Sequence, residues 1–105
     1  MKVLWSVNYT LDGIKGVLKE GGSARKAVAQ KLIESVGGTM EAFYFGYGDY
    51  DVYVIADLPD NQAAVSASLQ VTAAGGAKIA TTVLLTPEEF DGAVGKSVDY
   101  RPPGA

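Results

Sequence analysis

The chain has 105 residues, of which 48% are hydrophobic and 20% are charged, and this composition predicts one folded domain with one hydrophobic core. Nine basic and twelve acidic residues give a formal net charge of −3 without any basic stripe, so we expect neither nucleic acid nor an anionic membrane as a partner. Cysteine and histidine are both absent, which excludes disulfides, thiolate nucleophiles, histidine relays and the metal or haem sites that depend on these ligands.

The N-terminus and the hydropathy pattern predict a cytoplasmic protein. The first residues, "MKVLWSVNYT", become polar too early for a signal peptide, and no apolar run approaches the length of a membrane span. We find no internal repeat and no linker. We therefore expect a single domain over residues 1–95, followed by a C-terminal tail over residues 96–105.

The first third of the chain predicts a strand and two helices. The strand alternates between one side with Val3, Trp5, Val7 and Tyr9 and another side with Leu4, Ser6 and Asn8. Thr10 can cap a short helix, and Ser23 can cap a longer helix after the break at Gly21-Gly22. The apolar stripe of the longer helix consists of Val28, Ala29, Leu32, Ile33 and Val36.

The segment "FYFGYGDYDVYVIAD", residues 43–57, predicts two strands joined by a tight turn at Gly48-Asp49. This turn would place three pairs opposite each other on one face: Tyr47 with Tyr50, Phe45 with Val52, and Phe43 with Val54. The other face would carry Ala42, Tyr44, Gly46, Asp51, Tyr53, Ile55 and Asp57. Because large side chains occur on both faces, we expect both faces to be covered.

The remaining part of the chain predicts a helix, a strand and a short closing helix. Asp60 can cap the first of these helices, whose buried side would be Ala64, Val65, Ser68, Leu69 and Thr72. Gly75-Gly76 ends that helix, and residues 78–85 form the strand. In "TPEEF", Thr86 and Glu89 have the spacing of a capping box around Pro87.

The order strand, helix, strand, strand, helix, strand predicts an α+β, ferredoxin-like βαββαβ fold. Its four-stranded antiparallel sheet has helices on one face only. The bare face would include Leu4, Tyr44, Tyr53, Ile55 and Leu84. A monomer rarely leaves so much apolar surface in water, so we expect a homodimer in which the two sheets face each other, with higher multiples of this dimer as a further option.

Several segments resemble the GYD domain family of small bacterial and archaeal proteins. They are "GDYDVYVIADLPD" at residues 48–60, "TPEEF" at residues 86–90 and "YTLDGIKG" at residues 9–16, together with Arg25. The most specific part of the resemblance is Gly48, Tyr50 and Asp51, followed by Pro59-Asp60. The resemblance implies a dimeric α/β-barrel protein. It implies no activity, because the family has no established biochemical function.

Two interpretations fit the aromatic cluster around residues 43–57. In the first, which is typical of aromatic residues in strands, the rings fill the core and Asp51 accepts backbone hydrogen bonds. In the second, the cluster lines a ligand pocket between sheet and helices, as in dimeric α/β-barrel proteins that hold ligands. Arg25 then either contacts the ligand or forms a salt bridge with Asp51 or Asp60. The candidate ligand-binding residues are Trp5, Tyr9, Arg25, Phe45, Tyr47, Tyr50 and Asp51.

We expect no metal and no cofactor. Asp49 and Asp51 are close in sequence, but Val54 stands where an EF-hand loop requires glycine. Residues 46–48 are not a dinucleotide fingerprint, because the third glycine is missing and a strand follows instead of a helix. Residues 21–26, "GGSARK", could offer an anion site at a helix start, although a chain break with a cap is the commoner interpretation.

Three functions fit the sequence, and we favour the first. It is a homo-oligomeric module that binds a small, partly aromatic or apolar metabolite without chemistry of its own. The second is a cofactor-independent oxygenase or isomerase with Tyr or Asp as acid or base, which the absence of histidine disfavours. The third is a regulatory dimerisation domain that acts through a partner protein.

Overall fold

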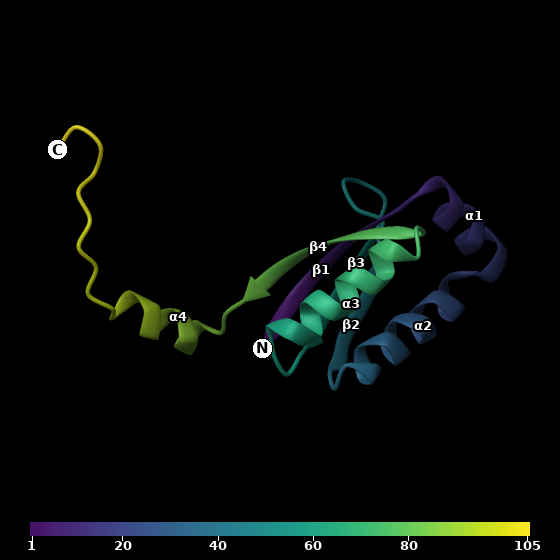
Figure 1. Cartoon of the computed structure of the whole chain (residues 1–105), viewed down its shortest axis with the longest axis horizontal. Coiled ribbons are helices and arrows are strands. Elements are labelled where there is room, and N and C mark those ends of the chain that lie inside the picture. Colours follow the sequence, from purple (N-terminus) through teal and green to yellow (C-terminus); the bar gives the residue numbers. More distant parts are fainter.

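The computed structural model describes residues 1–105 and contains a four-stranded antiparallel sheet and four helices (Figure 1). The elements in chain order are β1 (Lys2–Tyr9), α1 (Leu11–Glu20), α2 (Gly22–Ser35), β2 (Thr39–Phe45), β3 (Val52–Asp57), α3 (Asn61–Ala73), β4 (Ala77–Leu84) and α4 (Pro87–Val94). The strand order in the sheet is β2-β3-β1-β4, with all pairs antiparallel. This arrangement confirms the predicted ferredoxin-like fold, with two consecutive helices between β1 and β2.

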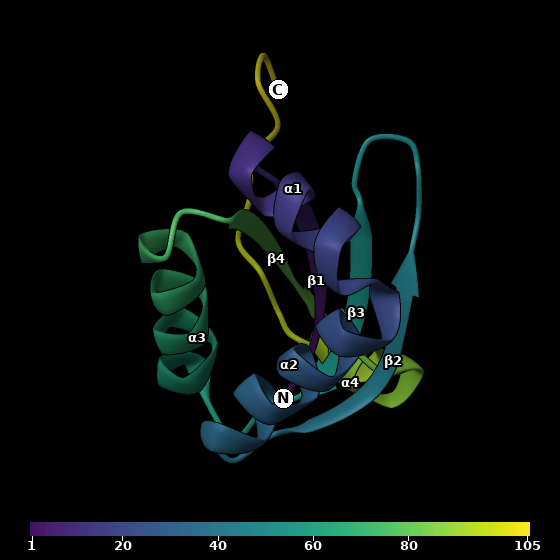
Figure 2. The same cartoon turned by 90° about the vertical axis from the view of Figure 1, so that its right-hand side faces the viewer.

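Strand β1 lies in the middle of the sheet and its alternation divides the sheet into two faces, as the sequence predicts. Trp5 pairs with Val54 of β3 and with Thr81 of β4, so these side chains share one face. Helices α1, α2 and α3 all lie over this face (Figure 2). Helix α2 packs over β2 and α3 packs over β4, which leaves a space between the two helices above β1.

The hydrophobic core lies between the sheet and these helices. Its largest completely buried side chains are Val3, Ile33, Val52 and Leu58. They come from β1, α2, β3 and the segment after β3, so the core joins elements that are far apart in sequence.

The predicted caps of α1 and α3 are confirmed, whereas the cap of α2 is not. Thr10 and Asp60 each accept a hydrogen bond from the backbone N–H three residues later, at 3.2 and 2.8 Å. Ser23 is not a cap, because α2 already begins at Gly22. Gly21 has a φ of +86° and is both the C-cap of α1 and the N-cap of α2. The chain therefore changes direction within one residue, and no side-chain cap can be placed there.

The buried side of α3 differs from the prediction except at Ala64, which is buried as predicted. Ala63, Ala64 and Ala67 are buried, whereas Val65 and Leu69 are exposed by 55% and 62%. The apolar pattern favoured the face with the larger side chains. The helix instead turns its alanine face to the sheet, because small side chains allow its backbone to approach β4 more closely.

The hairpin between β2 and β3 has the predicted register but is shorter than predicted. Phe45 lies opposite Val52, and strand pairing ends there. Residues 46–51 form a loop and not a two-residue turn. The predicted pairing of Tyr47 with Tyr50 is therefore wrong.

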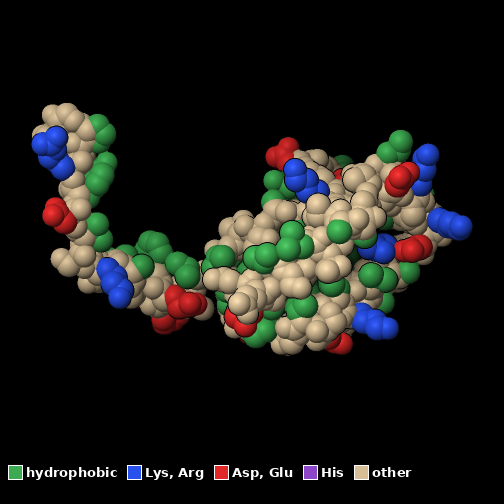
Figure 3. All heavy atoms as spheres, in the orientation of Figure 1, with side chains coloured by type: hydrophobic (Ala, Val, Ile, Leu, Met, Phe, Trp, Pro, Cys, Tyr) green, Lys and Arg blue, Asp and Glu red, His purple; other side chains and the backbone are tan.

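Helix α4 and the residues after it form an arm that extends from the body of the molecule (Figure 1). With this arm, the whole molecule is 56 Å long. The predicted capping box at Thr86 and Glu89 is present. The backbone N–H of Thr86 donates to the Glu89 carboxylate at 3.0 Å and holds the pKa of this carboxyl below its ordinary value. The arm stands apart in the space-filling view (Figure 3), and its Phe90 and Val94 are more than half exposed.

A close backbone contact joins α1 to the turn before β4. A Cβ atom added to Gly13 would lie 1.8 Å from the carbonyl oxygen of Gly76, so only glycine fits without a backbone shift. Thr10 binds the same turn, since its backbone N–H donates to the Gly76 carbonyl at 3.0 Å and its hydroxyl donates to the Gly75 carbonyl at 2.8 Å. These contacts fix the position of α1 over the end of the sheet.

We expect Gly13→Ala to lower the free energy of unfolding by about 1–3 kcal/mol, because the added methyl group forces α1 away from the turn. Gly16→Ala in the same helix is the control. Its Cβ would meet nothing within 4 Å, and alanine is the better helix former, so its stability should stay equal or rise. Urea denaturation of both variants measures the difference. Equal midpoints for the two variants would contradict the close contact.

Candidate ligand-binding pocket

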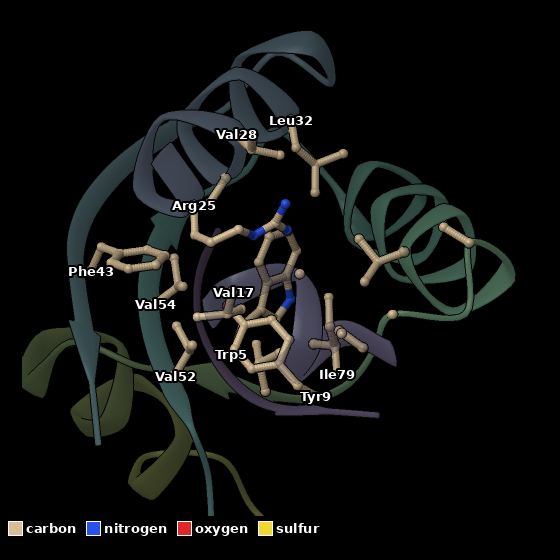
Figure 4. A pocket seen from close by; sticks show the side chains of 18 of the residues that line it. Trp5, Tyr9, Val17, Arg25, Val28, Leu32, Phe43, Val52, Val54 and Ile79 are labelled. Carbon is tan, nitrogen blue, oxygen red and sulfur yellow. The ribbon is translucent and has the colours of Figure 1, made fainter. Parts of the chain in front are cut away.

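A pocket of about 460 Å³ lies between the helix-bearing face of the sheet and the helices (Figure 4). Its lining comprises 20 residues, of which 14 are hydrophobic. Small-molecule sites in proteins have this range of volume and this predominance of apolar lining.

Alternation along the strands builds the floor of the pocket. In a strand every second side chain points to the same face, so the neighbouring strands β3, β1 and β4 present their helix-facing residues together. The floor includes Trp5, Val7, Tyr9, Val52, Val54 and Ile79.

The three helices build the walls, and small residues keep the space open. Helices α1 and α2 cover one side and α3 covers the other side. The main wall residues are Gly13, Gly16 and Val17 on α1, Val28 and Leu32 on α2, and Val71 on α3. Val28 belongs to the predicted stripe of α2 but is 48% exposed, because it borders the pocket and not the packed core.

Only two charged residues line the pocket, and they bind each other. Arg25 Nη1 lies 3.5 Å from Glu20 Oε2, with the two side chains exposed by 32% and 46%. The predicted salt bridge of Arg25 with Asp51 or Asp60 is therefore replaced by one with Glu20. Gly21 explains this pairing, because the sharp turn at this residue brings the last residue of α1 next to the first turn of α2.

Two buried nitrogen atoms at the pocket have no hydrogen-bond partner. They are Nε1 of Trp5 and Nε of Arg25. Trp5 is only 2% exposed and comes from the floor, and Arg25 extends from α2 into the pocket (Figure 4). Buried N–H groups in proteins nearly always have a partner, so an acceptor is expected beside each of these two donors.

Three of the seven candidate ligand-binding residues line this pocket together, namely Trp5, Tyr9 and Arg25. The other four lie outside its lining: Phe45, Tyr47, Tyr50 and Asp51. The early end of the β2–β3 pairing explains the separation, because the last three of these residues lie in the loop at residues 46–51 and not in a strand of the pocket floor.

The three aromatic residues outside the lining have different surroundings. The Phe45 ring contacts Phe43 edge to face, with 5.2 Å between centroids, and lies against Gly22 at the start of α2. Tyr47 is fully exposed in the loop. Tyr50 packs its ring edge to face on Tyr53, with 6.1 Å between centroids, and Tyr53 belongs to the opposite face of the sheet.

Asp51 connects the loop to the end of β1. Its Oδ2 accepts a hydrogen bond from the backbone N–H of Tyr9 at 2.9 Å, and its own N–H donates to the Val7 carbonyl at 2.9 Å. Its carbonyl oxygen accepts from the N–H of Gly46, also at 2.9 Å, and so closes the loop. Asp51 thus has the contacts expected of a backbone-binding carboxylate.

The sequence analysis did not single out the contribution of α1 to the pocket. Gly13, Gly16 and Val17 have a spacing of three and four residues, which places them on one face of a helix. A glycine on a helical face indicates either close contact with another backbone or open space beside the helix. Gly13 has the close contact, with Gly76, and Gly16 borders the cavity.

No group of three or more His, Cys, Asp or Glu side chains is arranged to hold a metal ion. None of the helices has the length and apolarity that crossing a membrane requires.

We expect Asp51→Ala to destabilise the protein by about 1.5–3 kcal/mol, the range for hydrogen bonds to charged groups, because the N–H of Tyr9 loses its acceptor. Asp49→Ala in the same loop is the matched control and should change stability by less than about 0.5 kcal/mol, as exposed positions usually do. Thermal unfolding of the two variants tests this. If both variants melt with the wild type, Asp51 does not hold the loop.

The comparisons with known proteins agree with the fold. The sequence model described as "GYD domain" matches residues 4–94. No curated protein and no solved structure matches the chain. The match runs from the third residue of β1 to the end of α4 and thus includes the pocket, nearly all of the sheet and the loop that contains Gly48, Tyr50 and Asp51. The chain belongs to the GYD domain family.

Proposed function

We propose that the protein binds a small, partly aromatic or apolar metabolite in the pocket between the sheet and the helices, without catalysing a reaction. The observation that carries this proposal is the cavity of about 460 Å³ next to the core. The pocket is partly open to solvent, and its volume and apolar lining are typical of small-molecule sites in proteins. A ligand with an apolar body would remove these lining side chains from water, and this gain supports the proposal.

The small residues around the cavity support this proposal. Gly16 has no neighbour within 4 Å of an added Cβ, so a larger side chain at this helix position meets no obstacle. Glycine is a poor helix former, and the chain nevertheless has glycine there. Local helix stability does not explain this residue, whereas room for a ligand does.

The chemistry of the lining favours binding over acid–base catalysis. Of the predicted acid and base candidates, Asp51, Tyr47 and Tyr50 lie outside the lining, and only Tyr9 remains at the pocket. Asp51 is also engaged by backbone N–H of β1. A catalytic group must reach its substrate within hydrogen-bond distance, and this requirement disfavours the enzyme hypothesis.

Gly16→Leu tests the proposed binding site, because the leucine side chain would enter the cavity. The probe is N-phenyl-1-naphthylamine, a neutral apolar dye. Trp5 is the only tryptophan and borders the cavity, so energy transfer from Trp5 reports that the dye is bound, and its dependence on residue 16 locates the dye in the pocket. We expect the wild type to bind the dye and Gly16→Leu to bind it at least about tenfold more weakly, since losing apolar contacts worth 1.4 kcal/mol has that effect.

Gly92→Leu is the matched control, because Gly92 also lies in a helix and also has open space around an added Cβ, but it does not line the pocket. This control should bind the dye like the wild type. A folded Gly16→Leu variant with unchanged affinity, or a wild type that shows no transfer from Trp5, would exclude the pocket as the binding site.

We also infer a homodimer through the face of the sheet that carries no helix. Tyr44 and Tyr53 on this face are exposed by 71% and 37%, and Leu4, Ile55 and Leu84 are half-buried beside them. Apolar patches of this kind are typical of interaction sites. At the margin of the face, Lys2 Nζ lies 2.9 Å from Glu41 Oε2, and this hydrogen bond raises the pKa of Lys2. An apolar centre with a charged margin is typical of protein interfaces.

Ile55→Lys tests the dimer, because a buried unpaired charge costs several kcal/mol, on the order of the whole stability margin of a domain. We expect the wild type to scatter light as a dimer and the variant to scatter as a folded monomer. Leu18→Lys is the control, since Leu18 is 81% exposed on α1 in the helical layer. It should remain dimeric. A wild type that stays monomeric at micromolar concentration would refute the interface.

A further inference from the structure

We propose that the ligand of this pocket is a small monocarboxylate with an apolar or aromatic body, whose carboxylate accepts hydrogen bonds from the Trp5 indole and the Arg25 guanidinium. This inference rests on the binding function proposed above and specifies the class of ligand.

The unpaired indole N–H of Trp5 points to a hydrogen-bond acceptor in the ligand. The ring is 2% exposed and Nε1 has no partner, although a buried tryptophan N–H usually has one. A phenylalanine would supply an apolar ring at this position without an unpaired donor. Trp5 forms part of the pocket floor, so a small shift of the neighbouring side chains would expose this N–H to an acceptor in the pocket.

The Arg25 guanidinium is divided into an outer and an inner part. Nη1 is directed to Glu20 at 3.5 Å, whereas Nε is buried and unpaired. A guanidinium has five donors in a planar fork that matches the two oxygens of a carboxylate. Figure 4 shows the Arg25 side chain extending from α2 toward the Trp5 ring, so a side chain of the helical layer and one of the sheet border the same pocket.

The charges around the pocket favour a monoanion. Arg25 and Glu20 are the only charged residues in the lining, and Glu20 is 46% exposed. An ion pair with this exposure is weak, so a ligand carboxylate can replace Glu20, whose side chain then returns to water. A dianion would leave one charge uncompensated among apolar side chains, whereas a neutral ligand would leave the Arg25–Glu20 pair in place and offer the inner N–H no charged acceptor.

The apolar walls define the remainder of the ligand. Val17, Val28, Leu32 and Val71 from three helices face Ile79 from the sheet, with no further charged group among the lining residues. A hydrocarbon chain or ring buried between them gains the hydrophobic contribution that a carboxylate alone lacks. The carboxylate therefore orients the ligand, and its apolar body supplies the affinity.

Two matched pairs of probes test the inference in the full chain by isothermal titration calorimetry. The pairs are 1-naphthoate with 1-naphthamide, and octanoate with octanamide, so that the ring and the chain each appear with and without the charge. We expect the wild type to bind at least one acid about tenfold or more tightly than its amide, because hydrogen bonds to a charged group differ from neutral ones by roughly that factor.

Variants of Arg25 and Glu20 should change the preference for the acid over its amide in opposite directions. Arg25→Met, which keeps an apolar side chain of similar length, should abolish the preference for the acid. Glu20→Gln should strengthen binding of the acid and leave the amide unchanged, since it removes the competing carboxylate. Arg101→Met is the control, because Arg101 is exposed in the C-terminal arm, and it should behave like the wild type.

The indole N–H of Trp5 gives a direct readout of contact. With a single tryptophan, the protein has one indole resonance in an amide-correlation NMR spectrum. Octanoate has no aromatic ring, so no ring current adds to the shift of this resonance. A hydrogen bond from the indole to its carboxylate should move the resonance downfield. Octanamide should move it less.

The outcomes separate this inference from the proposed function. If the neutral dye binds in a manner that depends on Gly16 but neither acid is preferred over its amide, the carboxylate assignment is wrong and the binding function stands. If neither the dye nor any of the four probes binds, both are refuted. An acid preference that persists in Arg25→Met would also overturn the assignment.

Discussion

The double pairing of β1 is the constraint on which the rest of the structure depends. Because β1 is bonded to β3 on one side and to β4 on the other, its residues cannot shift register without exposing Trp5 and Val7 to the bare face. Hydrogen bonds from outside the sheet ladder also fix the C-terminal end of β1. Asp51 binds the backbone of Tyr9, and Thr10 binds the turn before β4. The position of α1, and with it one wall of the pocket, follows from these contacts.

The pocket results from the break between α1 and α2. A single straight helix in this place would pack along the sheet, as α3 does, and would leave little space above β1. The left-handed conformation of Gly21 instead lets two helices meet at one residue. The same turn places Glu20 beside Arg25 and directs the guanidinium toward the interior. One backbone conformation thus provides the cavity and the position of its only cation.

Local rules predicted much of the fold and only part of the site. The alternation of β1 and the caps at Thr10, Asp60 and Thr86 depend on neighbouring residues, and they are confirmed. The loop at residues 46–51 was misjudged because its carboxylate binds β1, which lies 42 positions earlier in the chain. The rotation of α3 and the partner of Arg25 also depend on elements that a local pattern does not contain.

The residues that carry the family resemblance serve the scaffold more directly than the pocket. Tyr50 packs on Tyr53 at the bare face, and Asp51 binds the backbone of Tyr9 beneath the helices. The loop between β2 and β3 therefore contacts both sides of the sheet at one point. A second copy bound to the bare face would contact Tyr53 and Tyr50. The neighbouring Asp51 binds β1, which forms part of the pocket floor. The segment at residues 43–57 thus connects the two faces of the sheet, and it contributes Phe43, Val52 and Val54 to the pocket that Trp5 and Arg25 also line.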